Sequence, residues 1–301
     1  MLQRMSLLVL VLSCCLQGVA IKSARAAACC TSATAFGVGR LLMWEQFAVG
    51  TRTSVKSELA SFDNDGALLF NEESLGELRT DFYALFALAK PTSIFVQLPW
   101  AVPWESDNEA VHWHSGVGDT QLGIRHQAIA IGEYAELPGV ALMASILMPT
   151  GRAKTGASLA TGSGSFGFFL GAALEKTFES IWFTQLNVGG RFPLPQRLPD
   201  NDSYWPGLGL DLGLVGGVEF AQNMVISLSS QFVADSEQYF NGIAKERSGR
   251  YKGSAAVALS WRFNPHWTAS LSGSSDILIA GLGKYSAGVA SAGVGIRYGY
   301  F

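Results

Sequence analysis

Hydrophobic and polar residues alternate over long stretches of this chain, and the clearest example lies between residues 208 and 236. One parity holds Leu208, Leu210, Leu212, Leu214, Val218 and Phe220, whereas the other holds Gly209, Asp211, Gly213, Gly217 and Glu219. A period of two is that of a β-strand with one apolar and one polar face. The pattern pauses at residues 221–223 and resumes at Met224, which predicts a hairpin. Each run has about 13 residues, enough to cross a bilayer at a tilt of about 45°.

The same alternation predicts a set of strands along the whole chain after residue 45. We expect them at residues 46–58, 77–90, 92–102, 116–131, 139–148, 165–176, 181–192, 208–220, 224–236, 250–263, 266–276 and 288–301. Their connections alternate between roughly a dozen residues and only a few, as in bacterial barrels with long outer loops and short periplasmic turns. Residues 132–138 form the one turn that is longer than this rule expects. The predicted fold class is all-β: a transmembrane antiparallel up-and-down β-barrel of about 12 strands with both ends in the periplasm.

Two residues interrupt the pattern. Pro99 lies inside the third predicted strand and marks an end or a bulge, because proline cannot donate to a strand ladder. Phe301 is a typical last residue of outer-membrane barrels, yet it falls on the polar parity of its own strand. A bulge near the terminus, or one residue beyond the usual register, would explain that parity.

A soluble β-sandwich is the structural alternative, and composition argues against it. The chain is 49% hydrophobic and only 15% charged, against about 25% in globular proteins. Beyond the N-terminus, no apolar run reaches the 18 or so residues of a membrane helix, so the hydrophobicity is spread over short alternating segments. A sandwich also gives no reason for tryptophans at strand ends, where Trp182, Trp261 and Trp267 lie and where membrane barrels carry aromatic girdles.

The first 28 residues have the pattern of a cleaved signal peptide. Arg4 provides a positive start, Leu7–Leu12 an apolar segment, and Ala26–Ala28 a small-residue cleavage site. We therefore divide the chain into a signal peptide (1–28), an N-terminal lead-in or small plug (29–45) and an outer-membrane β-barrel (46–301). Lipidation of Cys29 is an alternative to an ordinary mature start, but the leucine usual three places before a lipoprotein cysteine is absent.

The charge balance excludes one class of partner. Of the 21 basic residues, Arg4, Lys22 and Arg25 leave with the signal peptide, so 18 remain against 24 acidic residues, a net charge of −6. A negative mature chain argues against nucleic-acid binding.

Charged residues of both signs fall on the polar parity of the predicted strands. The lumen-facing candidates are Arg52, Lys56, Arg79, Asp81, Asp119, Arg125, Arg191, Asp211, Glu219, Lys252, Arg262 and Arg297. Glu175, Asp235 and Asp276 share this parity, so the two signs are nearly balanced. Balance favours structural ion pairs across the lumen, since isolated charges in a narrow space are costly. The alternative is a set of charges that contacts passing solutes and tunes selectivity.

An enzymatic barrel would need a histidine, a serine and an orienting polar residue on adjacent strands. His112, His114 and Ser115 cluster in an expected outer loop, and the two histidines could bind a metal if the segment is extended. We favour the alternative interpretation, a polar outer loop with a tryptophan at the membrane interface. His126 falls on the lipid-facing parity and His266 in a turn, so neither supports a triad. We expect no enzyme activity, no metal and no cofactor.

Glycine-rich segments around the fourth strand carry a family resemblance. Gly116-Val117-Gly118-Asp119 with Leu122-Gly123-Ile124-Arg125, then Pro149-Thr150-Gly151, then Leu159-Ala160-Thr161-Gly162-Ser163-Gly164, resemble the motifs of the phenol meta-degradation pathway family of outer-membrane transporters. The resemblance implies a barrel that admits small hydrophobic or aromatic compounds. In that setting Asp119 points into the lumen and Pro149-Thr150-Gly151 begins an outer loop.

The sequence therefore predicts a channel or passive transporter for small, hydrophobic or aromatic solutes in the bacterial outer membrane. Two alternatives stay open: a barrel hydrolase of lipids or esters, and a structural barrel with a filled lumen. The expected partners are outer-membrane lipid, the small-molecule solute and, during biogenesis, the barrel-assembly machinery.

Overall fold

A computed structural model describes residue 41 and residues 45–62, 68–69, 74–106, 110–134, 136–152, 159–178, 181–197, 203–245, 248–277 and 287–301. The signal peptide and Cys29 lie outside these residues. In the described part of the chain, no helix is long and apolar enough to cross a membrane.

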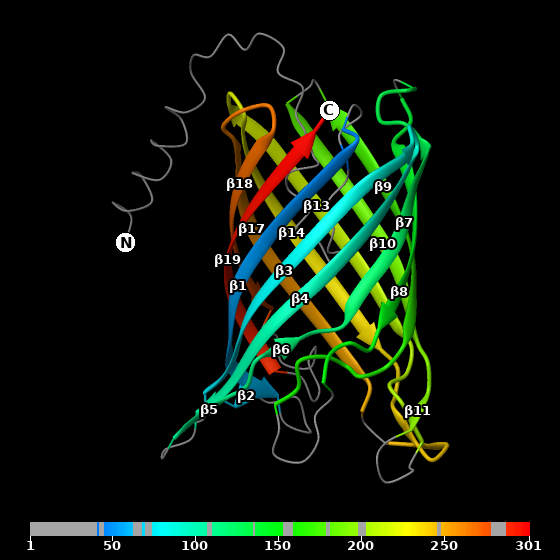
Figure 1. Ribbon diagram of the computed structural model, residues 1–301, viewed down its shortest axis with the longest axis vertical. Helices are drawn as coiled ribbons and strands as arrows, with labels where there is room; N and C mark the ends of the chain where they lie inside the picture. The colour runs from blue at the N-terminus through cyan, green and yellow to red at the C-terminus, as the bar shows by residue number, and fades with distance from the viewer. Residues whose placement is uncertain are drawn as a thin grey trace.

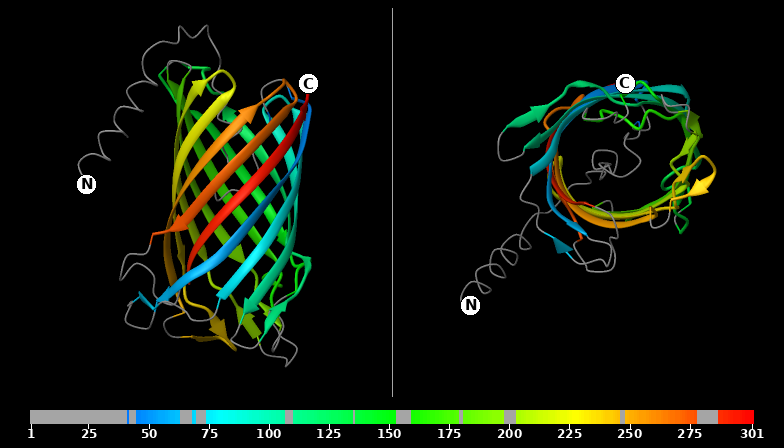
Figure 2. Two further views of the ribbon diagram at one scale, coloured as in Figure 1. Left: turned by 90° about the vertical axis from the view of Figure 1, so that its left-hand side faces the viewer. Right: turned by 90° about the horizontal axis from the view of Figure 1, so that it is seen from below.

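The long strands form one closed antiparallel barrel of twelve strands (Figure 1). They are β1 (Phe47–Phe62), β3 (Ser74–Ala89), β4 (Thr92–Ser106), β7 (Thr120–Ile129), β8 (Gly139–Met148), β9 (Gly167–Phe178), β10 (Trp182–Pro193), β13 (Gly209–Ala221), β14 (Met224–Asp235), β17 (Arg250–Arg262), β18 (Trp267–Asp276) and β19 (Ala287–Tyr300). Each pairs with the next, and β19 pairs back with β1 from Phe47↔Tyr300 to Ser61↔Ala287. Figure 2 shows the resulting ring from below. The predicted fold class is confirmed.

Short strands gather at one end of the barrel. There β2 (Leu68–Leu69), β5 (Val111–Trp113) and β6 (Gly116–Val117) extend the barrel wall, and β11 (Gln196–Arg197), β12 (Ser203–Trp205), β15 (Tyr239–Phe240) and β16 (Ile243–Ala244) form a separate small sheet. We call this the long-loop end. The start of β1 and the C-terminus lie at the opposite, short-turn end (Figure 1).

The two faces of each strand differ in exposure as the alternation predicts. Along β13, Leu212 and Leu214 are exposed, whereas Asp211 and Glu219 are each only 6% exposed. Large apolar side chains cover the outer face in this way on all twelve strands. An apolar outside and a polar inside are what a barrel in a bilayer requires, because lipid satisfies no polar group.

Pro99 does not end its strand, so the predicted end near residue 102 is wrong, but the register with β6 and β7 shifts by one residue beside it, as a bulge does. The strand β4 continues to Ser106, and Pro99 pairs with Asp81 of β3. On the other side, Gly118 N donates to Pro99 O at 2.7 Å, and the ladder from β7 stops at Gln97 before β6 resumes at Trp100. The missing N–H of Pro99 therefore faces the gap between β6 and β7, where no ladder bond is lost.

The chain terminus explains the parity of its last residue. Tyr300 pairs with Phe47 and is exposed, and the register with β1 is regular from there to Val289. Phe301 is thus one residue beyond the strand, which confirms the explanation that it lies one residue past the usual register. Its ring lies 5.3 Å from that of His266. The first interpretation, a bulge near the terminus, is wrong.

Candidate functional site

The inward face of the barrel carries the charged residues that the sequence singled out. All twelve candidates lie on the parity opposite the exposed apolar side chains, although Asp119 falls in the break between β6 and β7 rather than in a strand. Their ion pairs are Lys56–Glu77, Arg79–Asp81, Arg125–Glu175, Arg191–Asp211, Arg191–Asp235, Lys252–Asp276 and Arg297–Glu45. Six of these pairs join residues on the same, adjacent or next-nearest strands, and the seventh joins Arg297 of β19 to Glu45 just ahead of β1. Among the described residues, these pairs run along the wall, and none of them crosses the lumen.

The most buried pair among the strands is Arg125 with Glu175. Arg125 Nη2 donates to Glu175 Oε1 at 2.8 Å, and the two side chains are 10% and 4% exposed. Arg125 belongs to β7 and Glu175 to β9, so the bond passes over β8. Arg125 Nη1 also approaches Met143 of β8 at 3.9 Å. The pair ties three strands together on the inside of the wall.

A second cross-strand link centres on Arg191 of β10. Its Nε donates to Asp211 on β13 at 2.7 Å, and its Nη2 donates to Asp235 on β14 at 2.8 Å. The guanidinium lies over Gly209 of β13, where a Cβ would be 2.8 Å from Arg191 Cζ. Glycine at this position lets the long side chain lie flat against the wall.

The chain ahead of β1 also enters the barrel. Glu45, 5% exposed, accepts hydrogen bonds from both terminal nitrogens of Arg297 on β19, the Nη1 bond being 2.8 Å long. Leu41 packs against an inward cluster of Leu85, Phe95 and Ala48. Sequence reasoning missed Glu45, because the residue precedes the first alternating run. Glycine at position 299 leaves space for the Glu45 carboxylate, because a Cβ there would overlap it.

Four candidates have no ion pair within the described residues: Glu219, Arg262, Arg52 and Asp119. Glu219 accepts a hydrogen bond from Asn223 N at 3.1 Å, and Arg262 donates to Asn223 Oδ1 at 3.4 Å, both at the turn between β13 and β14. Arg52 of β1 donates to Ser272 Oγ on β18 at 3.3 Å. Arg52 is paired in register with Asp81 of β3, but the Asp81 carboxylate is bound by Arg79 Nε at 2.9 Å.

Asp119 fastens the glycine-rich segments together at the long-loop end. Its carboxylate accepts hydrogen bonds from Gly151 N at 3.1 Å, Ser163 N at 2.5 Å and Ser163 Oγ at 2.7 Å. Nearby, Thr161 Oγ1 donates to Val117 O at 2.9 Å. The segments that carry the family resemblance therefore meet in space, and Asp119 serves the loop between β8 and β9.

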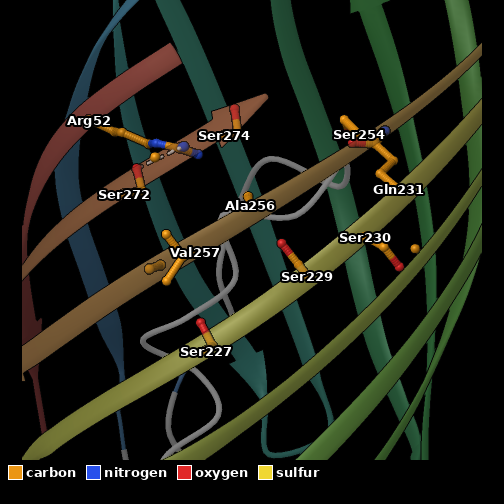
Figure 3. Close-up of a pocket in the computed structure, with 13 residues that line it drawn as sticks. Arg52, Ser227, Ser229, Ser230, Gln231, Ser254, Ala256, Val257, Ser272 and Ser274 are labelled. Carbon is orange, nitrogen blue, oxygen red and sulfur yellow. Dashed lines mark hydrogen bonds between the residues drawn. The ribbon is translucent and has the colours of Figure 1, made fainter. Parts of the chain in front are cut away.

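One part of the lumen wall is lined by hydroxyl groups. A cavity of about 90 Å³ lies against β14, β17 and β18, and Arg52 reaches into it from β1 (Figure 3). Its inward side chains are Arg52, Ser227, Ser229, Gln231, Ser254, Ala256, Ala258, Ser272 and Ser274. We call it the hydroxyl cavity. The sequence hinted at it through serines that repeat on the polar parity of these strands.

The opposite part of the wall is bulkier. Tyr83 and Leu85 on β3, Phe95 on β4, Phe169 on β9 and Phe183 on β10 all lie on inward parities, and Leu85, Phe95 and Phe183 are buried.

Two of the histidines, His112 and His114, lie at the long-loop end, whereas His126 and His266 lie at the short-turn end. His112 is exposed in β5, and His114 N donates to Pro103 O at 3.1 Å. His126 pairs with Thr92 Oγ1 at 2.9 Å, and His266 Nδ1 lies 2.9 Å from Gly299 O. Within the ranges described above, no three His, Cys, Asp or Glu side chains gather as a metal site.

Comparisons with known proteins agree with this architecture. No protein-family model and no curated protein matches the sequence. Among solved structures, an outer membrane channel from Pseudomonas putida F1 superposes with a TM-score of 0.72 at 13% identity, covering 85% of this chain and 96% of that one. The NanC porin gives 0.52 at 8% identity, covering 83% and 98%. The translocator domain of the autotransporter NalP from Neisseria meningitidis gives 0.50 at 13% identity, covering 84% and 88%. At these identities the likeness shows a shared outer-membrane barrel fold.

Proposed function

We propose that this protein is an outer-membrane channel through which small solutes diffuse passively. The observation that carries the proposal is a lumen wall in which bulky residues occupy one side and hydroxyl groups line a cavity on the other. Ion pairs along the wall neutralise most charges, and none of these pairs spans the lumen, which is consistent with a path for water and solute. The likeness to a channel and a porin supports the same role.

The remaining assignments belong to this proposal. Residues 1–28 would be the exported signal, 29–45 a lead-in or plug and 46–301 the barrel, with the long-loop end outside the cell and the short-turn end in the periplasm. Small hydrophobic or aromatic solutes are the expected cargo, by resemblance to the phenol meta-degradation pathway family. Lipid and the barrel-assembly machinery would be its partners in the membrane.

Solute passage is testable by swelling of vesicles that contain the refolded protein in an isotonic small sugar. We expect swelling with the native chain and at least fivefold slower swelling with Ser229→Trp, which puts an indole into the hydroxyl cavity. The matched control is Leu228→Trp, one residue away on the lipid face. Heat-modifiable gel mobility establishes that each variant has folded.

The outcomes separate the alternatives. Swelling that Ser229→Trp slows and Leu228→Trp leaves unchanged supports a lumen path. A folded native protein that admits no sugar would instead indicate a structural barrel with a filled lumen. Ester hydrolysis that disappears in His114→Ala would favour the enzyme.

A further inference from the structure

We infer that the hydroxyl cavity is a binding site for the carboxylate group of small organic anions passing through the barrel, with Arg52 as the charged anchor. The inference rests on the proposed function, because it names the solute class that the channel favours. It is carried by the charge distribution around Arg52 and by the hydrogen-bonding groups beside it.

The charged groups around Arg52 sum to a positive charge. Arg52, Arg79 and Asp81 lie together on β1 and β3, and Asp81 is held by Arg79 at 2.9 Å. The next pair along these strands, Lys56 with Glu77, is neutral. This trio therefore carries one net positive charge, and the guanidinium of Arg52 is the group that is not held by a carboxylate.

The guanidinium of Arg52 lies within the hydroxyl cavity. Arg52 reaches past β19 to Ser272 of β18, where its Nη2 donates at 3.3 Å. The intervening strand has Gly293 and Gly295 at its inward positions, so no side chain blocks the reach. Figure 3 shows Arg52 directed into the cavity toward Ser272. One bond of this length leaves most of the five guanidinium N–H donors for a ligand.

Serine hydroxyls supply neutral hydrogen-bond donors beside Arg52. Among the described residues, the hydroxyls of Ser227, Ser229 and Ser254 line the cavity and make no hydrogen bond to another protein group. Each can donate to an anion. The cavity volume of about 90 Å³ leaves room for a carboxylate group beside these hydroxyls.

The chemistry follows from these groups together. A planar guanidinium matches a carboxylate through two parallel hydrogen bonds, which are stronger than neutral ones. Serine hydroxyls add donors but no charge, so binding stays weak enough for release, as conduction requires.

The experiment compares benzoate with phenol as blockers of single-channel chloride current in planar bilayers. The two probes share the ring and differ in the carboxylate. We expect benzoate to block the native channel at concentrations at least tenfold lower than phenol. In Arg52→Gln the benzoate block should weaken about tenfold, and the reversal potential in a potassium chloride gradient should shift toward cation preference.

The matched control is Arg197→Gln, which removes the same charge from an exposed site in the small outer sheet. It should leave both the block and the reversal potential unchanged. Arg52→Lys keeps the charge without the planar fork and should retain anion preference while losing most of the benzoate block.

Failure of the inference is distinguishable from failure of the proposed function. A native channel that conducts but responds equally to benzoate and phenol, or an Arg52→Gln channel with unchanged block, would overturn the carboxylate site alone. A folded native protein that passes no current would overturn the channel itself and the site with it.

Discussion

Removing the carboxylate of Glu175 should destabilise the barrel far more than removing that of Glu77. Both acids pair with a cation on the inward wall at similar lengths, Arg125–Glu175 at 2.8 Å and Lys56–Glu77 at 3.1 Å. They differ in burial: the side chains of the first pair are 10% and 4% exposed, those of the second 38% and 27%. The comparison therefore isolates the effect of burial on an ion pair.

The magnitudes follow from that difference. Glu175→Gln removes the negative charge that compensates the buried Arg125 guanidinium, and breaking a buried pair costs about 3–5 kcal/mol. Glu77→Gln frees Lys56 into a half-open lumen, where an ion pair is worth about 0.2–1 kcal/mol. Replacing both members by apolar residues, as Arg125→Met with Glu175→Leu, should recover most of the loss, because no charge stays buried.

The free energy of unfolding is measured by urea titration of the protein folded in lipid vesicles, followed by tryptophan fluorescence. Glu175→Gln should lower the urea midpoint clearly and Glu77→Gln hardly at all. Equal losses in the two single variants would refute the reasoning. So would a double variant as unstable as Glu175→Gln, because the loss would then not come from an uncompensated charge.

Three further predictions follow from other parts of the barrel. Leu228→Lys on the lipid face should cost about 2–4 kcal/mol in the same urea titration, because a charge then faces hydrocarbon, whereas Leu228→Ser should cost less. Glu45→Ala should destabilise the barrel by about 3–5 kcal/mol, since it leaves Arg297 without its buried acid; a loss below about 1 kcal/mol would mean that the chain ahead of β1 is not fastened there. Burial raises the pKa of Tyr204, whose ring lies 4.9 Å from Phe240, above its usual 10.0. The folded state therefore holds this proton more tightly than the unfolded state. The free energy of unfolding is unaffected below pH 10.0 and falls as the pH rises through the raised pKa. In Tyr204→Phe this part of the fall should be absent.

The barrel was predictable from the sequence because its physical cause is local. Each strand must face lipid on one side, so residues such as Leu212 and Leu214 alternate with Asp211 and Gly213 whatever the neighbouring strands are. Loop lengths added the strand order, since short turns allow only adjacent antiparallel pairing. Pro99 misled the prediction of one strand end, because whether its missing N–H matters depends on the break between β6 and β7, which no local pattern reveals.

The candidate site was predictable only in part. Parity placed Arg52 and Arg125 on the inward face, but it could not show that Arg125 finds Glu175 two strands away while Arg52 finds only a serine. Such pairing depends on the tilt of the strands and on small residues between the partners. Glu45 lies before any alternating run, and its role depends on the chain folding back into the barrel.

The central claim, an open lumen, is tested most directly by the current through single refolded molecules in a planar bilayer, with heat-modifiable mobility establishing the folded state. The account predicts discrete, steady current steps that scale with salt concentration and that Ser229→Trp reduces. A fully folded native protein that carries no current would contradict it.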